Sequence, residues 1–497
     1  ENNRLSAIDI PNAGRVTYNT YHWNRPAKIT LPGGSQIDLA YDPLMRLLSK
    51  AVKDPAQQFL MDYEYEHSPA NNITKKTTEQ GEYAYQYDEL SRLTQATNPV
   101  LEDENYTYDL LANRLSASGV EGSYDANNAL LTYGETAFEY DANGNLIKKT
   151  VGSQVTHYEY NVEGRLIRVT DGENNLIAEY DYDPFGRRIW KEVEGVRTYF
   201  VYAAEGLIGE YDENGVEIKG YGYRPNSMWT TNPLFQKTNG SYYWYQNDHI
   251  GTPQKLIDSQ GNVLWAAVYE AFGKAKVDVA LVSNHLRFPG QYFDEETSLH
   301  YNFFRDYDPK LGRYIKSDPI GLGGGINTYV YASNNPVFFI DFLGLAYSPI
   351  GEHGYNCRPS IAPWTEEWCD KLKNFIKKQR EMLKLYQEVA KGNQEAISSL
   401  QNDVEKLADP SMKGCFVNPK ITEVPGGTEI CVVHECEHIM QFVDVVRELM
   451  KGGNIKEPAW QKKVALWEIE AYKVGIEQGE NAYNAHCGGC QPGERWK

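Results

Sequence analysis

The chain has 497 residues, a net charge of −19 and 41% hydrophobic residues. At about 150 residues per domain, this length predicts two to four units. The acidic charge argues against a broad nucleic-acid-binding surface. No run of 18 or more apolar residues and no signal peptide are visible, so the sequence predicts no membrane span. Because the chain begins inside repeat sequence, we expect it to be part of something longer.

Cysteine usage divides the chain in two. Residues 1–345 contain no cysteine, and all seven lie between residues 346 and 497. Such different usage indicates different working environments for the two segments. An odd number leaves at least one thiol free or paired outside the chain. The motif Cys487-Gly-Gly-Cys490 fits a redox pair, half a metal site or a disulfide-bonded turn.

Tyr-Asp or a close variant recurs through residues 1–345, for example in YDELSRL at 87–93 and YDANGNLI at 140–147. The alternating residues before each Tyr-Asp predict a strand with one buried face. Asp, Asn and Gly then predict a turn, and the Leu that follows begins the return strand. Each unit is a hairpin of roughly 20 residues that cannot bury its own face, so neighbouring hairpins must stack.

Two longer segments are more specific than the repeats: a D-H-x-G-T-P element within 247–273, and residues 287–336. With them, residues 1–345 resemble the YD-repeat (RHS-repeat) family, and 287–336 resembles its RHS-repeat-associated core. The resemblance implies a mainly β fold, in which a strand ribbon spirals into a hollow shell over residues 1–286. The core with a self-cleavage junction follows at 287–345, and then a variable C-terminal domain that the shell encloses or releases. These repeats occur in bacterial polymorphic toxins, insecticidal toxin complexes and animal teneurins.

The core ends in two similar motifs, D-P-I-G-L at 318–322 and D-F-L-G-L at 341–345. The resemblance implies an aspartate autoprotease, with Asp318 and Asp341 catalytic and the scissile bond between Leu345 and Ala346. Two close carboxylates suit this reaction, because one stays protonated as an acid while the other activates water. Phe342 departs from the usual proline of the second motif.

Asp318 is the firmer of the two catalytic assignments. Asp341 either serves the reaction or positions the cleaved strand. Arg313, in a Gly-Arg-Tyr element, is a candidate to stabilise a carboxylate charge. The plainer alternative is that both aspartates cap turns, since Asp-Pro commonly starts a turn.

Residues 346–497 predict a mostly α, α+β domain. A helical period of apolar residues spans 364–408, and residues 415–433 suit short strands around a Pro-Gly-Gly turn. The H-E-x-x-H motif at 434–438 follows. On a helix, His434 and His438 share a face and can bind one Zn²⁺, with Glu435 as general base for a bound water. The motif resembles that of zincin-type peptidases; the alternative is a helix with two surface histidines.

A catalytic zinc normally takes a third protein ligand. The segment WEIEAY at 467–472 resembles the second helix of glutamate-type zincins. Helical phase favours Glu468, which shares a stripe with apolar residues, over Glu470, which shares one with charged residues. Either glutamate could instead be an ordinary salt-bridge partner four residues from a lysine.

These observations predict the C-terminal part of a bacterial RHS-repeat effector, in which the β shell encloses and self-cleaves from a zincin-like tail. The tail would be a zinc metalloendopeptidase acting on a target-cell protein, with no nucleic-acid partner. The resemblance implies a secreted effector, a secretion system that delivers it and a cognate immunity protein. Two alternatives stay open: a non-enzymatic YD-repeat adhesion protein, and an RHS toxin with a nuclease tail.

Overall fold

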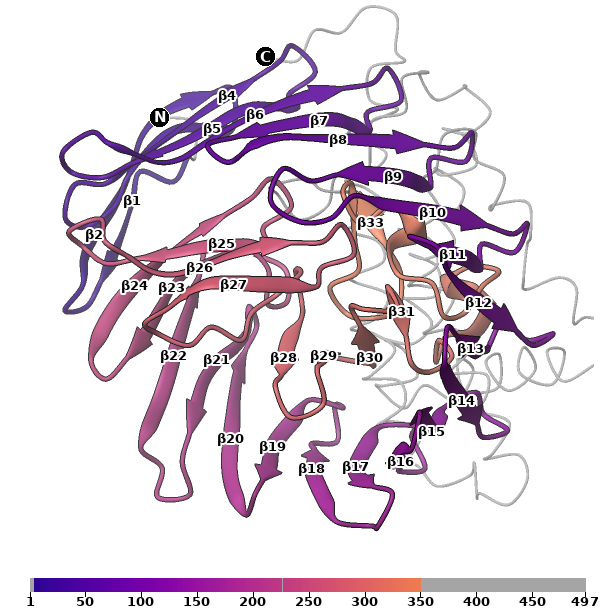
Figure 1. The fold of residues 1–497 in the computed structure, drawn as a ribbon. Helices are drawn as coiled ribbons and strands as arrows, with labels where there is room; N and C mark the ends of the chain where they lie inside the picture. Colours follow the sequence, from indigo (N-terminus) through magenta and orange to yellow (C-terminus); the bar gives the residue numbers. More distant parts are fainter. Residues whose placement is uncertain (1–3, 226, 350–497) are drawn as a thin grey trace, which may run out of the picture. The chain divides into compact units, whose positions relative to one another are not determined.

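The computed structural model describes residues 4–225 and 227–349 (Figure 1). The chain separates into two compact units, Glu1–Gly354 and Tyr355–Lys497, and every described residue belongs to the first. The described part is almost entirely strand and turn, which confirms the predicted mainly β fold there. The predicted zincin-like domain lies outside the described residues. No helix in the described ranges is long and apolar enough to cross a membrane.

One 27-stranded sheet makes up most of the described unit. Its first strands are β1 (Ala7–Ile10), β2 (Gly14–His22), β3 (Arg25–Thr30), β4 (Gln36–Tyr41), β5 (Leu47–Lys53), β6 (Phe59–His67), β7 (Ile73–Thr78), β8 (Gly81–Tyr87), β9 (Leu93–Thr97), β10 (Glu104–Tyr108), β11 (Arg114–Ala117), β12 (Val120–Tyr124), β13 (Leu130–Tyr133) and β14 (Thr136–Tyr140). The rest are β15 (Leu146–Val151), β16 (Gln154–Tyr160), β17 (Leu166–Asp171), β18 (Leu176–Tyr182), β19 (Arg188–Val193), β20 (Val196–Ala203), β21 (Gly206–Tyr211), β22 (Glu217–Tyr223), β23 (Pro233–Thr238), β24 (Ser241–Asn247), β25 (Pro253–Ile257), β26 (Val263–Tyr269) and β27 (Ala275–Ala280).

Each of these strands pairs antiparallel with the next along the chain, so the sheet is a continuous meander. Smaller elements follow: β28 (Tyr292–Asp294), β29 (Leu299–Asn302), β30 (Arg305–Asp308) and β31 (Arg313–Tyr314) form a second sheet. Figure 1 shows this small sheet inside the curve of the meander. The chain then passes through the 3₁₀ turns η1 (Gly321–Gly324) and η2 (Ala332–Asn334), and ends in the pair β32 (Phe339–Ile340) and β33 (Ser348–Pro349).

The aspartate of each repeat closes its turn with its own side chain. Asp88 Oδ1 accepts hydrogen bonds from the N–H groups of Leu90 at 3.0 Å and Arg92 at 2.9 Å. Between them Ser91 takes a left-handed φ of 62°, a conformation that such local capping stabilises. The same two bonds recur at Asp42, Asp109, Asp125, Asp141, Asn161, Asp171, Asp183, Asp212, Asp248 and Asp258.

In several repeats the tyrosine ties its hairpin to the previous one. Tyr182 donates its hydroxyl proton to the carbonyl oxygen of Leu166 at 2.7 Å. Tyr108 makes the same bond to Leu93. In both cases the acceptor is the leucine that begins the return strand one hairpin earlier. Because this bond satisfies a half-buried hydroxyl at no cost to the ladder, the Tyr-Asp pair specifies both the turn and the stacking.

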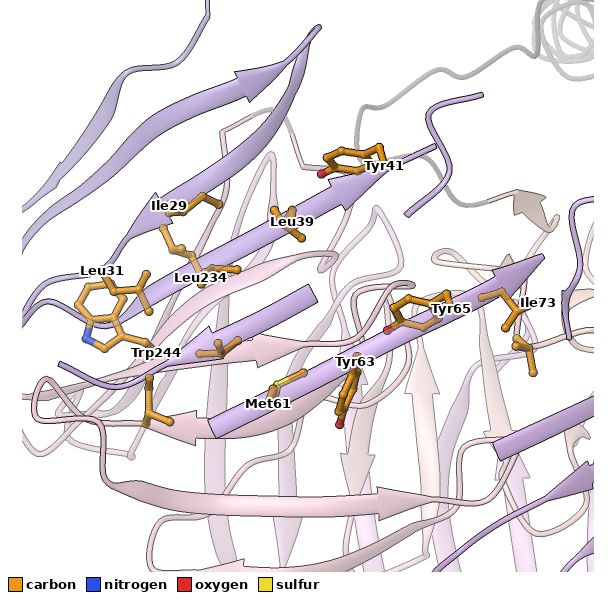
Figure 2. Close-up of a cluster of buried hydrophobic side chains, with 14 of the residues drawn as sticks. Ile29, Leu31, Leu39, Tyr41, Met61, Tyr63, Tyr65, Ile73, Leu234 and Trp244 are labelled. Carbon is orange, nitrogen blue, oxygen red and sulfur yellow. The ribbon is translucent and has the colours of Figure 1, made fainter. Parts of the chain in front are cut away.

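The sheet folds back so that early and late strands share one core (Figure 2). Leu234 and Trp244, from β23 and β24, join the cluster of Ile29, Met61 and Tyr63 from β3 and β6. Trp244 is only 1% exposed. Burial of large apolar side chains from both sets of strands therefore holds strands that are far apart in the sequence against each other.

A buried ion pair attaches the small sheet to the wall of the meander. Arg188 of β19 lies 2.6 Å from Asp294 of β28, with 1% and 2% of the two side chains exposed. Its guanidinium also lies 4.1 Å from the ring centroids of both Tyr180 and Tyr301. The aromatic rings and the carboxylate together compensate the cost of burying this charge.

Candidate functional site

Three charged side chains meet at the junction where the core ends. Arg305 begins β30, Asp318 follows β31 and Asp341 follows β32. Arg305 Nη2 lies 2.9 Å from Asp318 Oδ2 and 3.1 Å from Asp341 Oδ2. At most 3% of any of the three side chains is exposed. The structure thus brings together the two aspartates that the sequence singles out, and one guanidinium bridges them.

Asp341 holds the end of the core in place. Its Oδ1 accepts a hydrogen bond from the N–H of Leu345 at 3.0 Å, and its Oδ2 accepts one from the hydroxyl of Tyr314 at 2.8 Å. Burial, and to a lesser degree Asp341 itself, raises the pKa of Tyr314, so this hydroxyl stays a donor. Asn302 donates to the carbonyl oxygen of Asp341 at 2.7 Å. The segment from 341 to 345 is therefore fixed at both ends by side-chain contacts.

Arg305 binds the same segment through its other nitrogens. Its Nε donates to the carbonyl oxygen of Gly344 at 2.6 Å, and its Nη1 to that of Thr328 at 3.0 Å. The guanidinium carbon lies 3.6 Å from the centre of the Tyr314 ring. Gly344 has a φ of 69°, and a Cβ there would lie 2.5 Å from the carbonyl oxygen of Asn302, so only glycine fits this position.

Asp318 is the carboxyl group with an unusual proton affinity. Burial raises its pKa to about 6, with Asp341 adding to the rise, while Arg305 and the N–H of Ile320 oppose it. Asp318 Oδ1 accepts the N–H of Ile320 at 3.0 Å, the same local bond that caps the repeat turns. The turn-capping alternative therefore describes one oxygen of Asp318, whereas the other oxygen faces Arg305.

The carbonyl group of Leu345 lies beside Asp318. A Cβ placed on Gly324 would overlap Asp318 Oδ2 and would lie 2.6 Å from the carbonyl oxygen of Leu345, so both oxygens border one small space. Ala346, the next residue, is exposed. The pair β32–β33 brackets this segment from both sides. A carboxyl group, a peptide carbonyl and access for water thus coincide at the Leu345–Ala346 bond.

Arg313, the basic residue that the sequence suggested for the aspartates, lies elsewhere. Its Nη2 donates to the carbonyl oxygen of Asn128 at 2.6 Å, and its guanidinium lies over the rings of Tyr124 and Tyr329. That suggestion was wrong because Arg313 and Arg305 lie on neighbouring strands and only Arg305 faces the aspartates. Reasoning from the sequence missed Arg305 and Tyr314, and no local spacing marks either of them.

The predicted zinc site falls outside the described residues. It comprises Glu435 as base and His434, His438 and Glu468, or alternatively Glu470, as ligands. Zinc binding by these residues therefore stays a prediction. Within 4–225 and 227–349, no group of three or more His, Cys, Asp or Glu side chains is arranged to hold a metal ion.

The chain is similar to several known proteins. The chain is 34% identical over 352 residues to the double-stranded DNA deaminase toxin A of Burkholderia cenocepacia, covering 62% of this chain and 24% of that protein. It is 30% identical over 272 residues to the tRNA3(Ser)-specific nuclease WapA of Bacillus spizizenii, covering 51% and 11%. The chain therefore spans a quarter or less of these relatives. The solved Tc holotoxin pore of Photorhabdus luminescens matches with a TM-score of 0.56 and 18% identity, over 68% of this chain and 19% of that one, and shares the fold.

These names contradict the prediction of a zinc metalloendopeptidase that acts on a protein and has no nucleic-acid partner. The two relatives are named for action on DNA and on tRNA, and neither is named a metallopeptidase. The error has a physical reason. H-E-x-x-H fixes only three residues, and the i, i+4 spacing that puts two histidines on one face occurs on ordinary helices.

The resemblance of the first two-thirds to YD-repeat proteins has independent support. The Tyr-Asp turns, the stacked hairpins and the fold shared with the Tc toxin all agree with it. The family model described as the teneurin YD-shell matches residues 56–337, more than half of the chain. The chain belongs to the teneurin YD-shell family.

Proposed function

We propose that this chain belongs to a bacterial RHS-repeat toxin whose YD shell cuts its own backbone after Leu345. The cut would separate residues 346–497 from the shell. The observation that carries this proposal is the buried cluster of Arg305, Asp318 and Asp341 against the Leu345 backbone. A turn cap needs one carboxylate oxygen and no arginine, so capping alone does not account for two buried carboxylates on one guanidinium.

The chemistry assigns different roles to the two aspartates. Asp318 in its protonated form donates a hydrogen bond to the Leu345 carbonyl oxygen as charge develops there. Asp341 holds the N–H of Leu345, and Arg305 holds the carbonyl oxygen of Gly344, so the reacting bond cannot turn away. One water adds to the carbonyl carbon, the C–N bond to Ala346 breaks, and the nitrogen leaves with a proton. The products are a carboxyl group on Leu345 and an amine on Ala346.

The test is the time course of cutting during cell-free synthesis of the full chain, followed on denaturing gels. Wild type should yield two fragments with a new N-terminus at Ala346. Asp318→Asn cannot donate the acid proton and should slow cutting by at least about 100-fold. Asp341→Asn keeps an oxygen for the Leu345 N–H and should retain more activity than Asp318→Asn. Asp306→Asn is the matched control, because Asp306 is also buried with its pKa raised to about 6, yet it faces Arg188.

A wild-type chain that stays whole after long incubation would rule out self-cleavage. Cutting at the wild-type rate by Asp318→Asn would rule out its catalytic role. Loss of cutting in Asp306→Asn as well would assign the effect of Asp318 to folding.

We also propose that the tail acts on nucleic acid, and that delivery into a target cell and an immunity protein in the producer accompany it. The names of the two relatives support this class of substrate. Among nucleic-acid reactions, hydrolysis is favoured over zinc-dependent base deamination. Residues 346–497 contain no H-x-E, and His486 rather than proline precedes Cys487 in the C-x-x-C, whereas zinc deaminases carry H-x-E and P-C-x-x-C.

This second proposal is tested by incubating the full chain, and a chain ending at Leu345, with tRNA and with double-stranded DNA. If the full chain shortens the nucleic acid on gels and the chain ending at Leu345 does not, the tail is a nuclease. Base changes found by sequencing intact products would support a deaminase instead. Unchanged nucleic acid in both assays would overturn the proposal.

A further inference from the structure

Six consecutive turns along one edge of the sheet share a backbone feature. They follow β8, β10, β12, β14, β16 and β18, and the fourth residue of each turn, counted from its Asp or Asn, has a left-handed backbone. These residues are Ser91, Ala112, Asn128, Gly144, Gly164 and Gly186, with φ between 62° and 79°. A turn of this kind directs the carbonyl group of its left-handed residue away from the strand ladder, where it needs another donor.

The segment that follows the large sheet, which resembles the RHS-repeat-associated core, supplies a hydrogen-bond donor to every one of these six carbonyl oxygens. The six donors lie between residues 301 and 335, and each residue is at most 7% exposed. The bonds run from Asn335 to Ser91 (2.9 Å), Asn334 to Ala112 (2.9 Å), Arg313 to Asn128 (2.6 Å), Tyr329 to Gly144 (3.0 Å), Lys316 to Gly164 and Tyr301 to Gly186 (3.5 Å). The segment 301–335 therefore contacts six successive repeats at an equivalent atom.

Two of these contacts, from Lys316 to Gly164 and from Tyr329 to Gly144, have donors close to Asp318 or to its backbone partner Thr328. The N–H of Ser317 donates to the carbonyl oxygen of Gly144 at 3.0 Å, where the Tyr329 hydroxyl also binds. The N–H of Asp318 in turn donates to the carbonyl oxygen of Thr328 at 2.9 Å. The backbone on both sides of the site, 316–318 and 328–329, is thus held by turns that lie far away in the sequence.

We propose that the wound repeats position the cleavage site, so that Asp318 reaches the Leu345 carbonyl only when the turns at 141–145 and 161–165 are docked on the core. This inference rests on the proposed self-cleavage and adds its regulation. Gly144, Tyr329 and Lys316 are positioning residues that act through Asp318. Cleavage then occurs only in chains whose repeats have assembled correctly. A chain with misassembled repeats keeps residues 346–497 attached.

The structure offers a matched pair of glycines for the test. Gly144 and Gly215 both occupy the fourth position of an aspartate-capped turn, with φ of 78° and 75°. A Cβ on Gly144 would lie 2.6 Å from the Tyr329 hydroxyl oxygen and 2.9 Å from Ser317 Cβ, whereas a Cβ on Gly215 meets nothing within 4 Å. Substitution by alanine imposes the same backbone strain on both turns, but only Gly144→Ala displaces the core.

The experiment compares both variants in the full chain during cell-free synthesis, with the cut fraction followed against time. Both should lower the melting temperature of the shell, and Gly144→Ala should lower it more because its Cβ also meets Tyr329 and Ser317, so cutting is compared at a temperature at which both shells stay folded. Gly144→Ala should slow cutting about 100-fold, as expected for a displacement of about 1 Å at a reacting group. Gly215→Ala should cut at the wild-type rate. Equal rates for the two variants would overturn the inference while leaving self-cleavage intact, whereas a wild-type chain that does not cut would overturn the proposed function itself.

A second variant separates positioning from folding. The positive charge of Lys316 lowers the pKa of Asp318, as Arg305 does more strongly, whereas Asp341 raises it. Lys316→Met removes the donor to Gly164 and one positive charge, so cutting should slow and its decline with rising pH should move to higher pH. A purely structural role would lower the extent of cutting without moving the pH at which it declines, and that result would count against Lys316 as a positioning residue.

Discussion

At the scale of single residues, the two carboxylates that share Arg305 at the junction have different surroundings. Asp341 accepts hydrogen bonds from Leu345 and Tyr314 besides its pairing with Arg305. Asp318 accepts fewer, and burial dominates its proton affinity. A carboxyl group that is destabilised as an anion keeps its proton closer to neutral pH and so can serve as an acid there, whereas a carboxylate with several hydrogen-bond donors is suited to hold a chain in place.

Self-cleavage should therefore depend on pH with a defined sign. Since the pKa of Asp318 is raised to about 6, the acid form dominates below pH 6 and disappears above it. The initial rate of cutting should fall about 30-fold between pH 5 and pH 7.5, following the protonated fraction of a single group with this pKa. Quenched time points on gels measure it. A rate that rises across this interval would make Asp318 a base.

The sequence pointed to part of this site and not to the rest. Asp318 and Asp341 stand in two copies of a recognisable motif, so their pairing could be anticipated. Arg305 is 13 residues from Asp318 along the chain, and its role comes from the way β30 and β31 align, which no local period encodes. Arg313 was the more visible candidate, yet its strand directs it to Asn128. Which of the two arginines binds the aspartates depends on the direction of its side chain and on its burial. Both are set by tertiary structure.

At the scale of elements, the repeat turn works because one side chain satisfies two N–H groups. Asn161 takes the place of aspartate in one turn and makes both bonds, at 3.0 and 2.9 Å. An amide oxygen therefore serves as well as a carboxylate for capping. The charge adds a pair with an arginine only in some turns, such as Asp88 with Arg92 at 2.6 Å. These turns were predictable from sequence, because Asp, Asn and Gly act locally.

Substitutions at Asp88 should separate capping from charge. Asp88→Asn keeps the Oδ1 acceptor and should cost no more than about 0.5 kcal/mol of unfolding free energy, since the ion pair is partly exposed. Asp88→Ala leaves two N–H groups unpaired and should cost about 1–3 kcal/mol. Urea unfolding followed by tryptophan fluorescence gives both values. Similar costs for the two variants would mean that the pair with Arg92, rather than capping, stabilises the turn.

At the scale of the whole described unit, contacts between distant strands complete what the hairpins begin. Neighbouring hairpins hold each other locally, but Lys50 of β5 also binds the carbonyl oxygen of Asn247, and Tyr242 of β24 binds that of Pro11. The repeat pattern predicts stacking, since every hairpin has one buried face. It does not predict which repeats meet after the sheet folds back, because all hairpins are alike in pattern and only the summed curvature brings two of them together.

The shared core should therefore account for more stability than any single turn. Trp244→Ala removes a side chain that is 1% exposed, from the cluster joining β3 and β6 to β23 and β24. It should cost about 3–5 kcal/mol, the range for large aromatic residues in cores. Trp23, which is 75% exposed, is the matched control, and Trp23→Ala should change stability by no more than about 0.5 kcal/mol. Thermal unfolding by circular dichroism compares the two. Equal losses would show that early and late strands do not depend on each other, and that the shell is stabilised by its neighbouring hairpins alone.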